Sequence, residues 1–282
     1  MDERSPASRT AILVAALRGR AAARAAPLCV DPWAAQLAGA EGEALADELL
    51  AHYPPAELWI GLRTTWIDAR VAQLTVGERA CEQAVLLGAG FDTRAARLAR
   101  PGLRWFEVDH PNTGEERARR LGSLEGYPEA TATTVACDFE RDDFLERLVS
   151  GGFDPAKPAV FLWEGVVPYL TEPSVLATLE RLADGCHPRS VILFDHLGKR
   201  LARGGQVDSS DEGMRDLVGG LGEPFRFGLD DPIPLLHTAG FRQVRTVSFD
   251  EICLAQTGTY DRSRKLRFQY LTAASVARPL AV

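Results

Sequence analysis

Residues 86–94, Leu-Leu-Gly-Ala-Gly-Phe-Asp-Thr-Arg, place two glycines and an acidic residue directly after a short apolar run. Glycines at the end of a buried strand allow a tight turn and let a ligand come close to the backbone. Asp92 can cap a helix that follows. We therefore expect Gly88, Ala89 and Gly90 to line a bound ligand. A plain strand-to-helix turn is the alternative, because a Gly-x-Gly sequence alone is a weak signal.

An acidic residue follows this turn at a spacing typical of nucleoside binding. Asp109 stands 109 − 88 = 21 positions after Gly88 and ends the next apolar run. A carboxylate there is placed to accept hydrogen bonds from both hydroxyls of an adenosine ribose. Glu107 falls on the same face of the predicted strand and competes for this role. We assign the ribose to Asp109, which lies nearer the carboxyl end of the strand.

Polar residues also follow the third and fourth apolar runs. Asp138 can accept from an adenine amino group while Phe139 brackets the base, and a helix N-cap is the alternative for Asp138. Glu164 follows apolar residues and is desolvated unless it meets a cation. The sulfonium and α-amino groups of S-adenosylmethionine would supply one. A salt bridge to an arginine such as Arg63 or Arg70 is the alternative.

His196 follows the fifth apolar run, directly after Asp195. We expect it to face the rim of the ligand site, where an imidazole could act as a general base. A hydrogen-bonded structural role is the alternative, and the position at a strand end favours it. All of these polar candidates lie at the carboxyl ends of predicted strands, where ligands bind in open α/β sheets.

The residues between about 84 and 196 alternate between strand and helix patterns, which predicts a parallel sheet built from βαβ units. The apolar runs lack alternation, so both faces of the sheet are expected to be buried. The predicted strands are Ala84–Leu87, Leu103–Val108, Ala132–Cys137, Ala159–Trp163 and Val191–Phe194, and the predicted helices are Arg94–Leu98, Gly114–Leu121, Arg141–Val149 and Ser174–Asp184.

The two flanks differ from this core. Residues 1–77 predict a helical cap, with helices over 9–26, from Asp31-Pro32-Trp33 onward, and over 57–74. Residues 78–282 predict a Rossmann-like core with a lid insertion at about 197–232, in which the Gly-rich stretch 204–222 would bend. The core is expected to end with helix 233–238 and an antiparallel hairpin of strands 241–249 and 265–273 at the sheet edge.

Composition narrows the class of protein. The 282 residues carry a formal charge of −7, which argues against a broad nucleic-acid surface. The five cysteines are scattered without a CxxC pair, so we expect neither a metal site nor a disulfide framework. No signal peptide or membrane span is evident. We expect a cytoplasmic monomer or homodimer whose partner is a small-molecule acceptor, with no nucleic acid and no membrane.

Three kinds of function remain open on these residues. The third glycine of a dinucleotide fingerprint would fall at Thr93, which disfavours a nicotinamide-dependent oxidoreductase. A closing antiparallel hairpin is typical of methyltransferases. A non-catalytic nucleoside-binding module is the third alternative.

Six strings in this order resemble the leucine carboxyl methyltransferase superfamily, and in particular its bacterial branch similar to polyketide O-methyltransferases of the tetracenomycin type. They are Ser-Arg-Thr-Ala at 8–11, Asp-Pro-Trp-Ala at 31–34, Leu-Arg-Thr-Thr-Trp-Ile-Asp at 62–68, Leu-Gly-Ala-Gly-Phe-Asp-Thr-Arg at 87–94, Phe-Glu-Val-Asp-His-Pro at 106–111 and Trp-Glu-Gly-Val-Val-Pro-Tyr-Leu at 163–170.

The resemblance implies a class I methyltransferase fold with a helical cap, S-adenosylmethionine as cofactor, and methyl transfer to a small-molecule carboxyl or phenolic oxygen in natural-product biosynthesis. A protein C-terminal carboxyl group is the alternative acceptor. A carboxylate acceptor needs no base, whereas a phenol would profit from one. The resemblance implies these roles: Arg63 for the methionine carboxylate, Gly88 and Gly90 for the cofactor, Asp109 for the ribose, Asp138 and Phe139 for the adenine, Glu164 for the amino group, and Tyr169 near the transferred methyl.

Overall fold

The structure, a computed structural model, describes residues 8–128, 131–139, 141–203, 209–260 and 265–280. Its centre is a seven-stranded sheet of order β3-β2-β1-β4-β5-β7-β6. The first five strands are parallel, and β7 runs antiparallel to both β5 and β6. The strands are β1 Gln83–Leu87, β2 Arg104–Asp109, β3 Thr133–Ala136, β4 Ala159–Trp163, β5 Val191–Leu197, β6 Gln243–Ser248 and β7 Gln269–Ser275.

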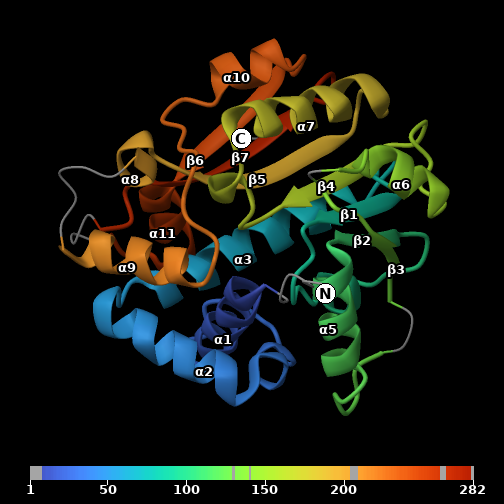
Figure 1. Ribbon diagram of the computed structural model, residues 1–282. Helices are drawn as coiled ribbons and strands as arrows, with labels where there is room; N and C mark the ends of the chain where they lie inside the picture. Colours follow the sequence, from blue (N-terminus) through green and yellow to red (C-terminus); the bar gives the residue numbers. More distant parts are fainter. Residues whose placement is uncertain (1–7, 129–130, 140, 204–208, 261–264, 281–282) are drawn as a thin grey trace.

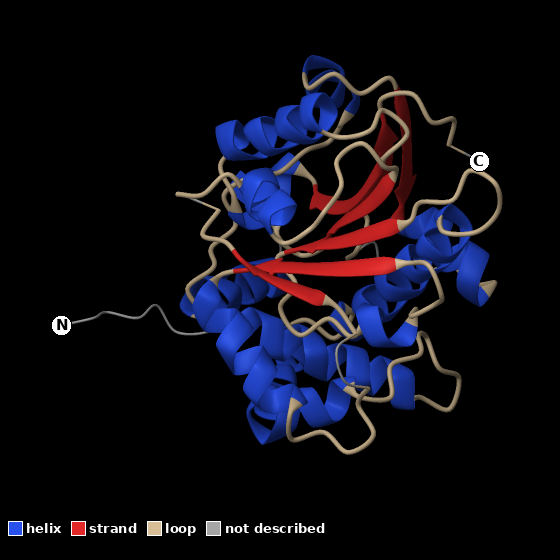
Figure 2. Ribbon diagram, turned by 90° about the vertical axis from the view of Figure 1, so that its right-hand side faces the viewer, coloured by secondary structure: helices blue, strands red, loops and turns tan. Residues whose placement is uncertain are grey.

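Helices cover both faces of this sheet (Figures 1 and 2). Every residue of β1, β4 and β5 is buried, and successive residues alternate between two apolar core clusters. In β4, Leu162 packs on the side of the N-terminal helices, whereas Phe161 packs on the side of α7 Glu172–Gly185 and α10 Ile233–Thr238. The predicted α/β class and Rossmann-like sheet, buried on both faces, are confirmed.

The N-terminal cap consists of α1 Arg9–Ala23, α2 Ala34–His52 and α3 Ala56–Leu74, drawn in blue in Figure 1. The predicted start of α2 at Asp31-Pro32-Trp33 needs correction, because the helix begins at Ala34 with Trp33 as its N-cap. Asp31 lies outside the helix, and its Oδ1 accepts from the backbone N–H groups of Trp33 and Ala34 at 3.2 and 3.1 Å. The cap and the sheet share one apolar cluster, in which Leu17 of α1 and Leu86 of β1 both lie. The cap therefore packs directly on the sheet.

The remaining helices mostly lie where the pattern predicted them, with ends shifted by a few residues. They are α4 Arg94–Arg97, α5 Pro111–Leu121, α6 Phe144–Ser150, the short 3-10 helix η1 Val167–Tyr169, α7, α8 Lys199–Arg203, α9 Ser209–Gly220, α10 and α11 Phe249–Thr257. None of the helices in the described part of the chain is long and apolar enough to cross a membrane.

Two predictions about the C-terminal third compare with the structure as follows. Within the Gly-rich stretch 204–222, predicted to bend as part of a lid, residues 204–208 lie outside the described residues and 209–220 form the helix α9, so the lid stays a prediction. Met214 and Val218, four residues apart, are buried toward the cap, and this spacing outweighs the glycines. The final strands pair as a terminal antiparallel unit as expected, but α11 connects them, and β7 begins at Gln269 rather than Lys265.

The burial of β4 on both faces gives a test of the fold. Phe161 is 1% exposed, and its ring lies 5.7 Å from that of Phe153. We expect Phe161→Ala to lower the free energy of unfolding by about 3–5 kcal/mol, since it leaves a cavity in the core. Leu254 on α11 is 55% exposed, and Leu254→Ala should change stability by less than about 0.5 kcal/mol. Urea unfolding followed by circular dichroism measures both, and similar losses would contradict the two-sided burial.

Candidate functional site

A cavity of about 830 Å³ opens at the carboxyl ends of the parallel strands, between the sheet and the cap. It is lined by residues from α1, α2 and α3, from the turns after β1, β2 and β4, and from α9. Nine of the residues predicted from the sequence line it together: Arg63, Gly88, Ala89, Gly90, Asp109, Asp138, Phe139, Glu164 and Tyr169.

The glycine turn brings bare backbone to the cavity wall. Gly88 and Gly90 have φ angles of 75° and 48°, in the left-handed region that favours glycine. A Cβ on Gly88 would lie 2.6 Å from Cγ2 of Val166, and one on Gly90 would lie 3.1 Å from the Cβ of Ala11. A larger residue at either position would be strained and would push into neighbouring side chains.

Asp109 lies beside this turn. Its Oδ2 accepts from the backbone N–H of Gly90 at 2.5 Å and its Oδ1 from that of His110 at 2.7 Å. Burial raises the pKa of Asp109. Glu107 is not among the lining residues, because both its oxygens are held by Arg117 at 2.5 and 3.0 Å. The preference for Asp109 over Glu107 agrees with this arrangement.

Asp138 and Phe139 line the cavity beyond Asp109, after β3. The side chain that caps α6 is Asp143, which accepts from the N–H groups of Leu145 and Glu146. Asp138 lies 3.5 Å from Nε of Arg141, which also lines the cavity. The assignment of Asp138 and Phe139 to an adenine stays a prediction.

Glu164 meets two arginines, which was the alternative given for it. Its Oε1 lies 2.8 Å from Nε of Arg63, and its Oε2 accepts from Nη1 of Arg94 at 2.6 Å. Arg63 also donates from Nη1 to Oδ2 of Asp195 at 2.6 Å, and Asp195 Oδ1 accepts from the N–H of Gly165. The roles of Arg63 and Glu164 in cofactor binding stay predictions.

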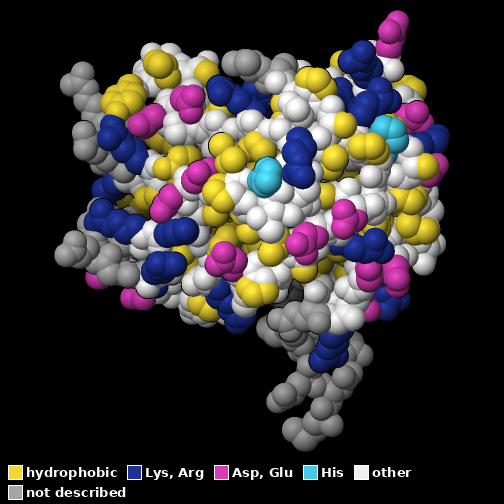
Figure 3. Space-filling view, turned by 90° about the horizontal axis from the view of Figure 1, so that it is seen from above, with side chains coloured by type: hydrophobic (Ala, Val, Ile, Leu, Met, Phe, Trp, Pro, Cys, Tyr) yellow, Lys and Arg dark blue, Asp and Glu magenta, His cyan; other side chains and the backbone are white. Residues whose placement is uncertain are grey.

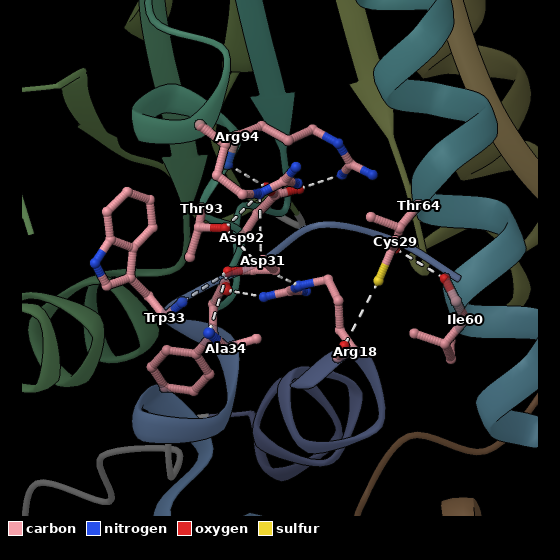
Figure 4. Close-up of polar contacts among 12 residues, drawn as sticks. Arg18, Cys29, Asp31, Trp33, Ala34, Ile60, Thr64, Asp92, Thr93 and Arg94 are labelled. Atoms are coloured by element: carbon pink, nitrogen blue, oxygen red, sulfur yellow. Dashed lines mark hydrogen bonds and ion pairs between the residues drawn. The ribbon is translucent and has the colours of Figure 1, made fainter. Parts of the chain in front are cut away.

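These contacts belong to a larger buried set of charges, which we term the cap network. Arg94 also pairs with Asp68 and Asp92, Arg97 pairs with Asp68, and Arg18 pairs with Asp31 at 2.6 Å. Figure 4 shows Arg18, Thr93 and Asp31 converging between α1 and the turn after β1. The members of the network are Arg18, Arg63, Arg94, Arg97, Asp31, Asp68, Asp92, Glu164 and Asp195.

The cap network carries four guanidinium groups and five carboxylates. Burial alone would raise the pKa of Asp92 and of Glu164, but the neighbouring arginines outweigh it and hold both values below their usual range. The pKa values of Arg18, Arg63 and Arg94 are raised, against the effect of burial, by the adjacent carboxylates. With its members ionised, the network has a formal charge of 4 − 5 = −1.

The other end of the cavity is apolar and lies under the cap and α9. Tyr169 stacks on Phe225 with ring centroids 5.6 Å apart. Burial, with a smaller contribution from Glu223, raises the pKa of the Tyr169 phenol, which is therefore protonated at neutral pH. The apolar wall is formed by Leu13, Leu17, Leu49, Trp59, Ile60, Met214, Val218 and Phe225.

Three residues that line the cavity were not predicted from the sequence: Asp195, Arg18 and Glu223. Asp195 stood at the end of a predicted strand, which was a usable signal. Glu223 follows α9 and accepts hydrogen bonds from Ser8 Oγ at 2.8 Å and from Thr10 Oγ1, so it ties the N-terminal segment to the loop after α9. Each of these two contacts joins residues far apart in the sequence, by 215 and 213 positions, and no local pattern reveals them.

His196 does not face the rim of the cavity, and this prediction needs correction. β5 continues through Leu197, because it pairs with β7 over that length, and so His196 lies inside the sheet at 1% exposure. Its Nδ1 is 2.8 Å from the carbonyl oxygen of Leu229, its Nε2 is 3.1 Å from Oγ1 of Thr272, and its ring stacks on Tyr270. This geometry agrees with the alternative stated for His196, a hydrogen-bonded structural role.

The chain matches a family model described as leucine carboxyl methyltransferase over residues 11–183. It is 35% identical over 200 residues to a protein of Mycobacterium ulcerans described as a candidate S-adenosyl-L-methionine-dependent methyltransferase; this covers 68% of the chain and 65% of that relative. A relative of the same description from Mycobacteroides abscessus is 31% identical over 80% of the chain and 74% of its own length. The chain thus spans about two thirds of the length of such relatives. The predicted superfamily is confirmed, and the names of the relatives agree with the predicted enzyme class and cofactor.

Solved structures agree with the fold. A DUF574 family protein from Streptomyces avermitilis superposes with a TM-score of 0.68 at 14% identity, over 97% of this chain and 98% of that one. A candidate methyltransferase from Thermobifida fusca gives a TM-score of 0.66 at 17% identity, over 99% and 97%.

The burial of His196 predicts a pH dependence of stability. Burial lowers its pKa from 6.5 to about 4. The unfolded chain therefore takes up a proton first, and stability that is complete above about pH 6.5 is lost as the pH falls toward about 4. Between pH 7 and 4.5, we expect the parent to lose about 2–3 kcal/mol more of its unfolding free energy than His196→Gln does. Urea unfolding across this range measures the difference. Parallel pH curves for the two proteins would show that His196 is accessible to protons in the fold.

Proposed function

This chain belongs to the leucine carboxyl methyltransferase family, and from that premise we propose that it transfers a methyl group from S-adenosylmethionine to an oxygen atom of a small-molecule acceptor. The observation that carries the proposal is one continuous cavity, lined at one end by the glycine turn and Asp109 and at the other by apolar and aromatic side chains. Its volume of about 830 Å³ falls in the range typical of small-molecule sites.

The residues at the polar end fit this cofactor. Gly88 and Gly90 form a backbone cradle that a Cβ would fill. The cap network has a formal charge of −1, and the cofactor, with a sulfonium, an ammonium and a carboxylate, has a net charge of +1. Among the described residues, Nη2 of Arg94 is buried without a hydrogen-bond partner, and Nε of Arg63 meets Glu164 without a directed hydrogen bond. Both are donors of the type that binds a carboxylate.

In this proposal each polar residue has a distinct task. Asp109 accepts from the ribose, Asp138 and Phe139 contact the adenine, and Arg63 and Glu164 hold the charged amino-acid end. The cofactor supplies an activated methyl group when bound. The protein supplies alignment and excludes water from the apolar end of the cavity. Tyr169, protonated at neutral pH, donates a hydrogen bond that holds the acceptor near the transferred methyl.

A carboxyl acceptor suits the apolar end better than a phenol. Among the described residues that line the cavity the one histidine is His110, which lies beside Asp109 with its Nδ1 accepting from the N–H of Asn112. His196, the base predicted for a phenol, is inside the sheet. A carboxylate is already ionised at neutral pH and needs no base. The aromatic and aliphatic wall favours an apolar organic acid, of the kind modified in natural-product biosynthesis.

A second candidate acceptor is the C-terminal carboxyl group of a protein, which the name of the family favours. An apolar wall that includes Leu49 and Ile60 also suits a leucine side chain next to the reacting carboxylate. The two candidates share the reacting group and differ in what is attached to it, so a direct comparison of acceptors separates them.

The ribose assignment predicts a loss of cofactor affinity. Asp109→Ala removes a charged acceptor from two hydroxyl groups, and we expect S-adenosylmethionine to bind about tenfold to several hundredfold more weakly, because a hydrogen bond to a charged group contributes about 1.5–3 kcal/mol. Glu116→Gln on α5 is the control, since Glu116 does not line the cavity and pairs with Arg119 and Arg120. Calorimetric titration compares the two. Equal affinities would reject the ribose role, and tighter binding of NAD than of S-adenosylmethionine would reject the function.

The choice of acceptor predicts a pH profile. With apolar carboxylic acids, with phenols and with a peptide ending in leucine, transfer of a labelled methyl group should be greatest to the small acids. We expect a rate that stays flat above about pH 6, because the acceptor is already ionised. Rates that rise with pH on phenols would identify a phenolic acceptor and a base. Methylation confined to the peptide would favour the second candidate, and no transfer to any class would contradict methyltransferase activity.

A further inference from the structure

A second, smaller pocket of about 140 Å³ lies at the opposite end of the sheet, and we term it the basal pocket. Val191 and Ala273 line it, whereas Leu197 and Gln269 line the large cavity. Val191 and Leu197 are the two ends of β5, six residues or about 20 Å apart, so the two sites open toward opposite ends of this strand. α3 reaches both, with Arg63 at the cavity and Trp66 at the basal pocket.

The basal pocket is strongly basic. Its lining includes Arg70, Arg245 and Arg278 and no aspartate or glutamate. No ion pair joins any of these three arginines to a carboxylate of the described residues. This contrasts with the cap network, where every guanidinium group has a carboxylate beside it.

The arginine N–H donors around the basal pocket are held in place, but not all of them have hydrogen-bond partners among the described residues. The guanidinium of Arg70 lies over the ring of Trp66, 5.2 Å from its centroid, and its Nη1 donates to Gln73 Oε1. Nε of Arg245 is buried and has no hydrogen-bond partner among the described residues. A buried donor without a partner costs free energy that a bound acceptor would restore. Three guanidinium groups in one pocket also repel one another unless an anion lies between them.

Cys81, which contacts Arg278, does not supply an anion to the pocket. Nη1 of Arg278 lies 3.3 Å from Sγ of Cys81. Burial raises the pKa of the Cys81 thiol, and the smaller opposing effects of Arg278 and Arg189 do not reverse this. Cys81 is therefore a neutral thiol at neutral pH. The two charged groups that act on it are both cations, so the positive region extends beyond the pocket itself.

We propose that the basal pocket binds a small oxyanion, a carboxylate or a phosphate, between the guanidinium groups of Arg70, Arg245 and Arg278. The planar fork of each guanidinium matches the paired oxygens of either group. The small volume excludes a nucleotide, and the apolar floor formed by Val191, Leu193, Ala273 and Leu280 accommodates a short hydrocarbon part. The proposal does not depend on the reaction assigned to the large cavity.

Calorimetric titration of the whole chain with inorganic phosphate and, separately, with acetate tests this proposal, with ionic strength held constant by chloride. We expect saturable binding of at least one of them, and the tighter one identifies the class of anion. Arg245→Gln should weaken binding about tenfold or more. Arg242→Gln is the matched control, because Arg242 lies outside the pocket and donates to the carbonyl groups of His237 and Phe241.

A variant that merely unfolds is recognised by its thermal transition, and Arg278→Gln then takes its place. A bound anion should also raise the melting temperature of the parent but not that of the Arg245→Gln protein. Saturable binding that survives both Arg245→Gln and Arg278→Gln would overturn the proposal, as would the absence of saturable binding of both anions to the parent.

Discussion

The cap is joined to the carboxyl ends of the strands by alternating buried guanidinium and carboxylate groups. From Arg18 the contacts run through Asp31, Arg97, Asp68 and Arg94 to Glu164, and from there through Arg63 to Asp195. An ion pair out of water is a poor source of net stability, but removing one member of a buried pair costs about 3–5 kcal/mol. The network therefore acts mainly on geometry, because each side chain is held from both sides.

Other features of the site depend on that geometry. Arg18 comes from α1, Asp68 and Arg63 from α3, Glu164 from the turn after β4 and Asp195 from β5. The network thus fixes the cap against the sheet at the edge where the large cavity opens. At Gly165 the φ of 68° favours glycine, and an added Cβ would lie in ordinary contact, 3.7 Å from both terminal nitrogens of Arg63. On the face in Figure 3, by contrast, acidic and basic side chains are scattered among each other over the surface.

Local signals predicted most of the sheet and the polar end of the site. Unbroken apolar runs marked β1 and β4, and the residues that follow them, Gly88 and Glu164, had to lie at one edge because parallel strands end together. The predictions that were wrong or missing concern residues whose contact partners lie far away in the sequence. His196 stays inside the sheet because β7, more than 70 residues later, extends β5 to Leu197. Asp195 meets Arg63 across 132 positions, and no spacing rule connects them. α9 is helical because its apolar residues pack against the cap. The glycine content of this segment does not indicate that packing.

The cavity contains two environments, a charged end and an apolar end. Charges of the cap network gather at the polar end, where opposite signs alternate and each ionised group has a partner. The other end offers Leu17, Trp59, Met214 and Phe225, which cannot solvate a charge, and there burial raises the pKa of the Tyr169 phenol. An acceptor that carried charge away from its reacting oxygen would have to bury that charge against apolar carbon. We infer that the apolar wall disfavours an acceptor with a second charge remote from its reacting oxygen. The carboxylate of Glu223, which raises the pKa of Tyr169, adds to this effect when the second charge is negative.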